Sequence, residues 1–344
     1  MNGTDRVVAR TINPATKAER EILLVAKHAM WPGGPHPEDG NHALYHVEIR
    51  EILRQIGLRV DLANSYEALF SRPRADFVFP LLNRGGFVNS EMLLPLLCRR
   101  LGLPFLGASP ILRGLADDKH LTKLEAKSRG VPTAPWAIYR RGAPIAESAC
   151  PMAERMVIKP NASSASWGVG DAFDWAGVKA AVERLHDEGH DAIVEPFLDG
   201  SDVEVPMIVQ NGRPAIMPMM LFEQADPTHL RTYWEKRDLV DRGAKYSLVP
   251  FDDAEWMPKI AEHARRMASM FMPFDYGRFE FRLDLARGKV MFLENNLNCN
   301  LWSQKVFGRS AARAGLSHAE LIETILAESL DRQGLMVRER DLVA

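Results

Sequence analysis

The stretch RFEFRLDLARGKVMFLENN, residues 278–296, carries the clearest structural signal in this chain. Charged and apolar residues alternate strictly from 278 to 284, so one face of a strand is charged and the other is apolar. Ala286-Arg-Gly288 then fits a three-residue hairpin loop whose last residue, a glycine, adopts positive φ. Residues 289–296 form the return strand. The stretch therefore predicts a β-hairpin with one face in the core and one charged face.

The loop also sets the register of this hairpin. Counting back from a Leu285–Lys289 pair gives the cross-strand partners Arg282–Phe292, Glu280–Glu294 and Arg278–Asn296. Two carboxylates that face each other on a sheet are unfavourable unless a cation lies between them. Two carboxylates and an amide provide the oxygen ligands that suit Mg²⁺ best. The register predicts a metal site at Glu280, Glu294 and Asn296, and a solvated outer face with a chance Glu–Glu pair is the alternative.

The composition is that of an ordinary globular protein. The chain has 344 residues, of which 46% are hydrophobic and 26% are charged. This length predicts two or three domains, and the composition supports a sizeable buried core. The net charge of -2 creates no field that would attract nucleic acid or an anionic membrane. We therefore expect neither of these as a partner.

The cysteines and the N-terminus indicate the compartment. Cys98, Cys150 and Cys299 are widely spaced and odd in number, which excludes a disulfide framework and a Cys-x-x-Cys metal site. The first apolar run, residues 22–26, is too short for a signal-peptide core or a membrane span. The sequence therefore predicts a cytoplasmic protein.

The first part of the chain alternates strands with helices. Strands are expected at 21–26, 59–62 and 76–82, and helices at 41–56 and 91–101. This βαβ rhythm predicts an α/β domain with a parallel sheet, whose ligand site lies at the carboxyl ends of the strands.

Two further segments follow. The second is expected to contain a helix beginning at Ala116 with aspartate at its entry, strands near 136–139 and 155–160, a helix at 174–188 and a strand at 192–195. The third is expected to contain alternating β structure from Asp202, a polar stretch at 224–246, a helix at 254–271, the hairpin 277–295 and a last helix at 317–332. This pattern predicts three domains, at residues 1–113, 114–198 and 199–344.

Five motifs follow one another in the order of a known family. They are Asp-Lys-x-x-Thr-Lys at 118–123, Val-Ile-Lys-Pro at 157–160, a small-residue loop at 162–170, Val-Glu-Pro-Phe at 194–197 and Arg-x-Glu…Glu-x-Asn at 278–296. From Gly33 to about residue 330, the chain resembles the ATP-grasp ligases, and within them the D-alanine–D-alanine ligase branch. The resemblance implies an α/β (α+β) ATP-grasp fold of three domains, with the nucleotide between the central and C-terminal domains. It also implies ATP, two Mg²⁺ ions for which Mn²⁺ can substitute, small-molecule substrates and a homodimer.

The resemblance implies a set of ATP-binding residues. Lys119 and Lys159 would meet the phosphates as point charges, where a plain surface lysine is the alternative. The loop 162–170 would wrap the β- and γ-phosphates with its backbone N–H groups, unless it is only a flexible connector. The other implied ATP ligands are Ser166 in this loop, Glu195 and Phe197 at the adenine, Asp202 at the ribose with Glu204 as a second candidate, and Lys245 at the γ-phosphate.

The resemblance also implies residues for the first substrate. Gly33-Gly-Pro-His-Pro-Glu38 resembles the glycine pair and glutamate that anchor an ammonium group, and Ala244-Lys-Tyr246 resembles a Lys-Tyr pair on a mobile loop. Tyr246 would be linked towards Glu38 through a serine of the small-residue loop. Direct alignment places Ala165 at this serine, so Ser166 matches the second serine of the family.

Arg278 is the remaining catalytic candidate. It shares a strand face with the metal ligand Glu280, two residues away, and would stabilise an oxyanion during acyl transfer. A salt bridge to Glu280 alone is the alternative.

The chain departs from the family on the acceptor side. The stretch 83–90 lacks the histidine and acids of the family, Cys299-Asn300 replaces its Pro-Gly, and Lys305 lies near the expected position of a serine that holds the acceptor carboxylate. D-alanine as both donor and acceptor is therefore not implied.

The expected activity is an ATP-dependent carbon–nitrogen ligase. ATP would phosphorylate the carboxylate of an amino acid or similar compound, and an amine would attack the acyl phosphate to give an amide, ADP and phosphate. Charge neutralisation and alignment carry the first step. Two alternatives stay open: a nucleotide-binding protein of this fold without turnover, and a ligase that phosphorylates a carbonyl or enol oxygen before amine addition.

Overall fold

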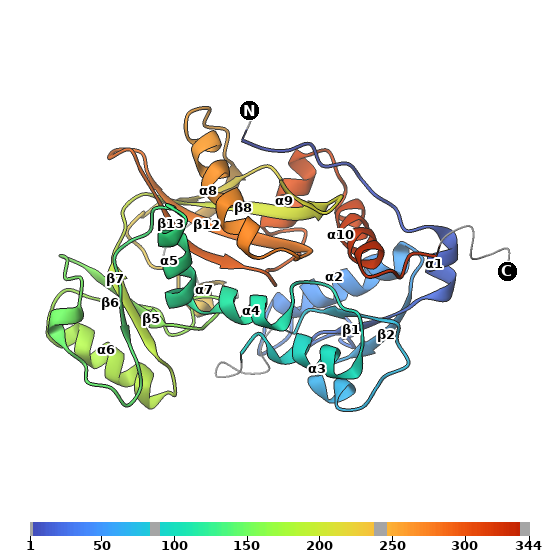
Figure 1. Ribbon diagram of the computed structural model, residues 1–344, viewed down its shortest axis with the longest axis horizontal. Helices are drawn as coiled ribbons and strands as arrows, with labels where there is room; N and C mark the ends of the chain where they lie inside the picture. Colours follow the sequence, from blue (N-terminus) through green and yellow to red (C-terminus); the bar gives the residue numbers. More distant parts are fainter. Residues whose placement is uncertain (1–2, 83–89, 237–245, 338–344) are drawn as a thin grey trace.

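The computed structural model describes residues 3–82, 90–236 and 246–337. Three β-sheets follow one another along the chain, with helices packed against each of them (Figure 1). The first sheet lies within residues 1–113, the second within 114–198 and the third within 199–344. The domain boundaries themselves stay a prediction.

The first sheet is parallel, as the βαβ rhythm predicted. Its central strand β1 (Glu21–Val25) lies between β2 (Arg59–Ala63) and β3 (Phe77–Pro80). The helices of this part are α1 (Pro14–Glu19), α2 (His42–Gln55), the 3-10 helix η1 (Tyr66–Leu69) and α3 (Leu93–Leu101). Helix α1 was not predicted, although the side chain of Asn13 caps it by accepting from the Thr16 backbone N–H.

The second sheet is antiparallel and small, in the order β4-β7-β5-β6. Its elements are β4 (Ala137–Tyr139), η2 (Glu147–Ala149), β5 (Met156–Pro160), β6 (Gly170–Ala172), α6 (Trp175–Asp187) and β7 (Ala192–Pro196). Two helices, α4 (Pro110–Asp117) and α5 (Lys119–Ser128), precede it, where one helix from Ala116 was predicted. The extended backbone of Asp118 separates them, and its side chain caps α5 by accepting from the Leu121 N–H.

The third sheet has the order β11-β10-β8-β12-β13, with β9 paired to β8. Its strands are β8 (Ser201–Gln210), β9 (Arg213–Ile216), β10 (Met220–Gln224), β11 (Tyr246–Pro250), β12 (Tyr276–Asp284) and β13 (Lys289–Asn296). Its helices are α7 (Tyr233–Lys236), α8 (Trp256–Met270), α9 (Val306–Arg313) and α10 (His318–Arg332). Helix α9 was not predicted.

The two ends of the chain share one core. Ile22 of β1, Phe77 of β3 and Leu326 of α10 belong to a single buried cluster, in which the last helix contacts α2 beside the first sheet (Figure 1). The apolar face of β12, with Phe279 and Phe281, packs in a second cluster that includes residues of α8. This packing leaves the opposite, charged face of β12 directed towards the second sheet.

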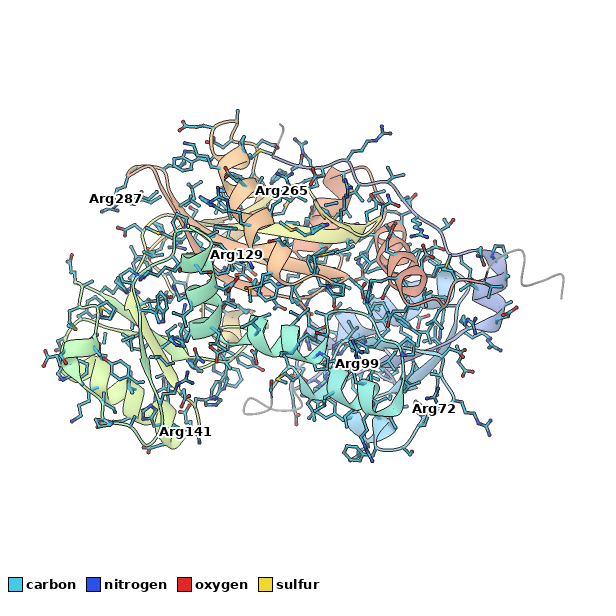
Figure 2. The ribbon with its side chains drawn as sticks, in the orientation of Figure 1. Arg72, Arg99, Arg129, Arg141, Arg265 and Arg287 are labelled. Atoms are coloured by element: carbon cyan, nitrogen blue, oxygen red, sulfur yellow. The ribbon has the colours of Figure 1, made fainter. Side chains whose placement is uncertain are left out.

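The six arginines labelled in Figure 2 lie on or beside different elements and are spread across the view. Within the described ranges, each helix is too short or too polar to cross a bilayer.

Candidate active site

The site is built on the charged face of β12 and β13. Glu280 pairs with Glu294 across the two strands, and Arg278 pairs with Asn296. Both pairs confirm the register predicted from the sequence. The two carboxylates therefore face each other on one sheet surface.

The tip of the hairpin differs from the prediction. Arg282 pairs with Met291 rather than Phe292, because Asp284 pairs with Lys289 and the loop has one residue more than expected. The register then shifts between Glu280 and Phe281, at a bulge that leaves Leu293 without a partner on β12. A bulge inserts one residue and turns the following side chains. Here it restores the Glu280–Glu294 pair.

A third carboxylate extends this pair into a row. Strand β8 pairs with the other side of β12, and its Glu204 lies opposite Glu280. Glu204 is only 3% exposed. We call Glu204, Glu280 and Glu294 the carboxylate row. Glu204 was the second candidate for the ribose ligand, after Asp202, but the structure places it beside Arg278.

Arg278 bridges two members of the carboxylate row. Its Nε lies 2.6 Å from Glu204 Oε2, and its Nη2 donates to Glu280 Oε1 at 2.6 Å. Burial alone would lower the pKa of Arg278, but the two carboxylates raise it above its ordinary value. Burial raises the pKa of Glu204 to about 8 and also raises that of Glu280, in spite of the nearby guanidinium. Arg278 is thus held by Glu204 as well as by Glu280.

Lysines surround the other end of the row. Lys119 Nζ lies 3.3 Å from a carboxylate oxygen of Glu294 and donates to the Ser163 carbonyl oxygen at 3.2 Å. Burial would raise the pKa of Glu294, but the ammonium groups of Lys119, Lys159 and Lys236 lower it to about 2. Glu294 is therefore ionised and available to a cation.

Two cavities meet at the carboxylate row. The large cavity has a volume of about 660 Å³ and reaches the first sheet, while the small cavity has about 170 Å³ and lies against the second sheet. Among the described residues, seven line both of them: Lys119, Ser163, Ala165, Arg231, Lys236, Glu280 and Glu294. The row thus lies at the junction of two binding spaces.

The small cavity collects most of the predicted ATP ligands. Lys159, Ser166, Glu195, Phe197 and Asp202 all line it. The Phe197 ring has the Arg155 guanidinium 4.1 Å from its centroid and that of Arg282 5.7 Å from it. An aromatic ring of this kind can stack against a flat base.

The two acids of this cavity already have partners. Lys159 donates to Glu195 Oε1, and Lys123 Nζ lies 2.7 Å from Glu195 Oε2. Burial would raise the pKa of Glu195, but the two lysines lower it to about 2. Asp202 accepts from Arg282 Nη1 at 2.8 Å and from Arg231 Nη2 at 3.1 Å. A nucleotide would have to share or displace these contacts.

The small-residue loop approaches the same junction. Ala165 and Ser166 have φ of 55° and 59°, a left-handed conformation that non-glycine residues seldom adopt. Successive backbone N–H groups in such turns form a concave anion site. Ala165 lines both cavities, whereas Ser166 lines the small one.

The residues predicted for the first substrate are placed differently. Glu38 is exposed at the tip of a turn closed by the bridge His36–Gly40, which directs its neighbour Asp39 inwards. Asp39 is 5% exposed and lines the large cavity, in the place expected for Glu38. Tyr246 also lines this cavity, but it begins β11 instead of lying on a loop. Lys245 lies outside the described residues, as does the stretch 83–89.

The segment after β13 forms another wall of the large cavity. The Leu301 backbone N–H donates to Tyr45 Oη at 3.1 Å, and Ser303 Oγ donates to Glu48 at 3.1 Å, so α2 holds this segment. Cys299 is buried, which raises the pKa of its thiol to about 12. This thiol is therefore not a nucleophile at neutral pH.

The donor set of Glu280, Glu294 and Asn296 fits Mg²⁺. Glu280 and Glu294 offer carboxylate oxygens, and Asn296 Oδ1 keeps a lone pair although it accepts from the Asn298 N–H at 2.9 Å. In the structure Arg278 and Lys119 supply the positive charge to these acids.

Sequence reasoning missed several contributors. Lys236 lines both cavities, and its charge lowers the pKa of Glu294, but the polar stretch that contains it has no periodic pattern. Lys123 was quoted only as part of a motif. Asn295 is 4% exposed and lines the large cavity, and within the described part of the chain neither of its amide atoms has a hydrogen-bond partner. The amide-rich run that begins at Asn295 is the feature of the sequence that could have indicated this residue.

Comparisons with known proteins agree with this geometry. Residues 126–327 match the family model described as D-ala D-ala ligase C-terminus. The uncharacterized protein y4sG of Sinorhizobium fredii is 29% identical over 234 residues, which cover 68% of each chain. A D-alanine–D-alanine ligase of Marinomonas sp. is 27% identical over 238 residues, which cover 68% of this chain and 71% of that protein.

A solved structure supports the fold independently. D-alanyl-alanine synthetase A from Vibrio cholerae superimposes with a TM-score of 0.73 at 16% identity, covering 91% of this chain and 98% of that one. The predicted ATP-grasp fold is thereby confirmed. Because the matched residues 126–327 make up more than half of the chain, this protein belongs to the D-alanine–D-alanine ligase family of the ATP-grasp superfamily.

Proposed function

We propose that this protein is an ATP-dependent ligase that joins a carboxylate to an amine and releases ADP and phosphate. One observation carries the proposal: the small cavity and the large cavity meet at Glu280 and Glu294. A nucleotide in the small cavity would present its γ-phosphate to a substrate in the large one. Relatives named as D-alanine–D-alanine ligases support the same reaction class.

Glu280, Glu294 and Asn296 would hold Mg²⁺, for which Mn²⁺ can substitute. When bound, the metal neutralises charge on the phosphates during transfer. The same acids would hold a second ion. Glu280 would then turn from Arg278 to the metal, and Glu204 would keep Arg278 in place.

Lysines and backbone amides would bind the nucleotide. Lys119, Lys159 and Lys236 line the small cavity and would pair with the phosphates as point charges. The left-handed turn at Ala165 and Ser166 would donate N–H groups to the same oxygens. Phe197 would stack on the base. Glu195 would accept a hydrogen bond from the amino group of the base, and Asp202 would bind the ribose hydroxyls. Lys245 is proposed as a further γ-phosphate ligand.

The acyl transfer would take place on the large-cavity side of the row. The substrate carboxylate attacks the γ-phosphorus and displaces ADP, and an amine then attacks the acyl carbon and displaces phosphate. Arg278 lines this cavity and would stabilise the oxyanion of the second step. Tyr246, Ser166 and Glu38 are proposed to orient the first substrate, with Asp39 closer to the cavity than Glu38.

The substrate pair is proposed to differ from two molecules of D-alanine. Asn300 and Lys305 line the large cavity, where Cys299-Asn300 replaces the Pro-Gly of the family and Lys305 lies near the position expected for a serine. An amino acid or amino-acid-like carboxylate remains the proposed donor. We further propose three domains at 1–113, 114–198 and 199–344, a homodimer, and action in the cytoplasm.

A substrate screen tests the ligase proposal. Panels of carboxylates and amines are incubated with ATP and Mg²⁺, with ADP release as the rate and product mass as the identity. Glu294→Gln should abolish turnover, and Asp284→Asn, on the same strand face but paired with Arg287 at the hairpin tip, should retain it. Nucleotide binding without turnover on any pair would favour the alternative of a binding protein. A phosphorylated enol or carbonyl intermediate that accumulates when the amine is omitted would favour the other alternative.

A further inference from the structure

Histidines gather beside the first sheet, far along the chain from the carboxylate row. Four of the ten histidines of the chain lie between residues 28 and 46. Ligand atoms of His28, His36 and Asp39 all lie within 4.8 Å of one another. We call these three residues the His-Asp cluster.

Local structure brings the cluster together. His28 follows β1, at the carboxyl end of the parallel sheet, and its Nε2 lies 2.7 Å from Asp39 Oδ2. His36 and Asp39 belong to one turn, closed by two backbone hydrogen bonds between His36 and Gly40. The ring centroids of His28 and His36 are 4.4 Å apart. Three potential ligands are thus directed to one point by a short turn and a strand end.

The ammonium group of Lys27 already contacts the cluster. Lys27 donates to the same Asp39 oxygen that faces His28. The side chain of Lys27 is 53% exposed, so its ammonium can turn into water at little cost. His28 and Asp39 are 6% and 5% exposed, and such buried polar groups need partners.

We propose that His28, His36 and Asp39 bind a divalent transition-metal ion, with Zn²⁺ as the best match. Two imidazoles and one carboxylate are a donor set for zinc and its neighbours, whereas Mg²⁺ prefers oxygen ligands alone. The ion replaces the Lys27 ammonium on Asp39. His36 Nδ1 accepts from the Glu38 N–H at 3.1 Å, and that N–H can bond water when the turn adjusts, because Glu38 is exposed.

A bound ion would change the shape and the charge of one wall of the large cavity. Asp39 lines this cavity, as do the neighbouring His42 and His46. A bound ion would fix the turn 36–40 and place a positive charge at the end of the cavity away from the nucleotide. The site does not depend on ligase activity and can be tested without a substrate.

Metal titration tests the site. Protein stripped with a chelator is titrated with Zn²⁺ against a chromophoric competitor, and Co²⁺ loading is followed by its visible d–d absorption. Wild type should bind one Zn²⁺ per chain in this cluster. His36→Ala and Asp39→Asn should each weaken binding more than tenfold and remove the absorption band of the Co²⁺ form.

Two controls separate the site from its surroundings. His42→Ala removes a histidine of the same cavity wall, 4.5 Å from the His46 ring but outside the cluster, and should leave Zn²⁺ affinity within twofold. Glu294→Gln disables the proposed Mg²⁺ site and should also leave it unchanged. Wild type that binds no Zn²⁺, or a His36→Ala variant that binds it as tightly as wild type, overturns the proposal. An equal loss in His42→Ala overturns the assignment to these three residues. If His36→Ala does not fold, Asp39→Asn and His28→Gln decide the outcome.

Discussion

Arg278 lies between Glu204 and Glu280, and only one of these acids is proposed to bind metal. Glu204 therefore has the role of keeping the guanidinium in position when Glu280 turns to the ion. Glu204→Gln should lower kcat by about 10²-fold, since small misplacements of a catalytic group cost this much. The KM for ATP should stay within threefold. Steady-state ADP release measures both, and an unchanged kcat would assign Glu204 to packing alone.

Asn295 is a buried amide whose side chain has no hydrogen-bond partner among the residues that the structure describes. An unsatisfied buried amide costs about 1–3 kcal/mol, so it is retained where a ligand completes it. Asn295→Leu should raise the free energy of unfolding by about 1 kcal/mol and lower kcat/KM for the substrate of the large cavity at least tenfold. Urea unfolding and steady-state kinetics measure the two effects. A stabilised variant with full activity would show that no substrate uses this amide.

Glu195 couples the stability of the second sheet to pH. Its pKa is lowered from 4.5 to about 2, so between these values the unfolded chain binds more protons than the native one. Its contribution is complete above pH 4.5 and is lost as the pH falls towards 2. Glu195→Gln should cost about 3 kcal/mol at neutral pH, because Lys123 and Lys159 lose their carboxylate.

The pH profile of this variant is the decisive measurement. The difference from wild type should be constant from neutral pH to pH 4.5 and should shrink below it. Glu183→Gln is a matched control, since Glu183 pairs with Lys179 on the exposed face of α6. It should change stability by less than about 0.5 kcal/mol at any pH. A pH-independent difference for Glu195→Gln would contradict the assigned ionisation.

The residues predicted correctly from the sequence are those whose positions follow from a local period. Glu280 and Glu294 were found because strand alternation and one turn place them opposite each other. Lys236 and Asp39 were not found, because their side chains reach the site through contacts between separate segments. The local periodicity of a sequence carries no information about contacts between separate segments.

At the scale of elements, the hairpin was predicted correctly for a reason that was only partly correct. The sequence suggested a three-residue loop and a regular ladder, whereas the loop is one residue longer and a bulge at Leu293 compensates. The alternation of charged and apolar residues does not predict a bulge, since Leu293 suits either face of a strand. The two errors cancelled at Glu294, so the predicted pairs Leu285–Lys289 and Arg282–Phe292 were wrong and the pairs of Glu280 and Arg278 were correct.

Helix α9 positions the wall of the large cavity through a close backbone contact. A Cβ on Gly308 would lie 2.2 Å from the Ser303 carbonyl oxygen, so only glycine fits there. Gly308→Ala should cost about 1–3 kcal/mol and displace the segment that includes Trp302 and Lys305. The KM of the substrate should rise while the KM for ATP stays unchanged. Gly170→Ala, where a Cβ has open space, is the control for stability. A Gly308→Ala variant with wild-type stability would contradict the close packing.

At the scale of the whole molecule, the site exists because the second and third sheets face each other. The strands of both sheets were largely predicted, but single-strand periodicity does not say how two sheets are oriented. The motif order, through its resemblance to a family, supplied that arrangement. The structure adds that α10 and the first sheet share one buried core, which joins the two ends of the chain.

This arrangement makes thermal stability a measure of nucleotide binding between the two sheets. A non-hydrolysable ATP analogue with Mg²⁺ should raise Tm, since a ligand at 100 times its Kd stabilises the native state by ~2.7 kcal/mol. Glu294→Gln should lose most of the Mg²⁺-dependent part of this shift, because a carboxylate at the junction of both cavities is removed. Asp284→Asn should keep the full shift, as Asp284 lies on the same strand face but contacts Arg287 instead. Differential scanning fluorimetry with and without Mg²⁺ measures the three proteins. Equal Mg²⁺-dependent shifts in all of them would place the metal away from the carboxylate row and remove the basis of the proposed site.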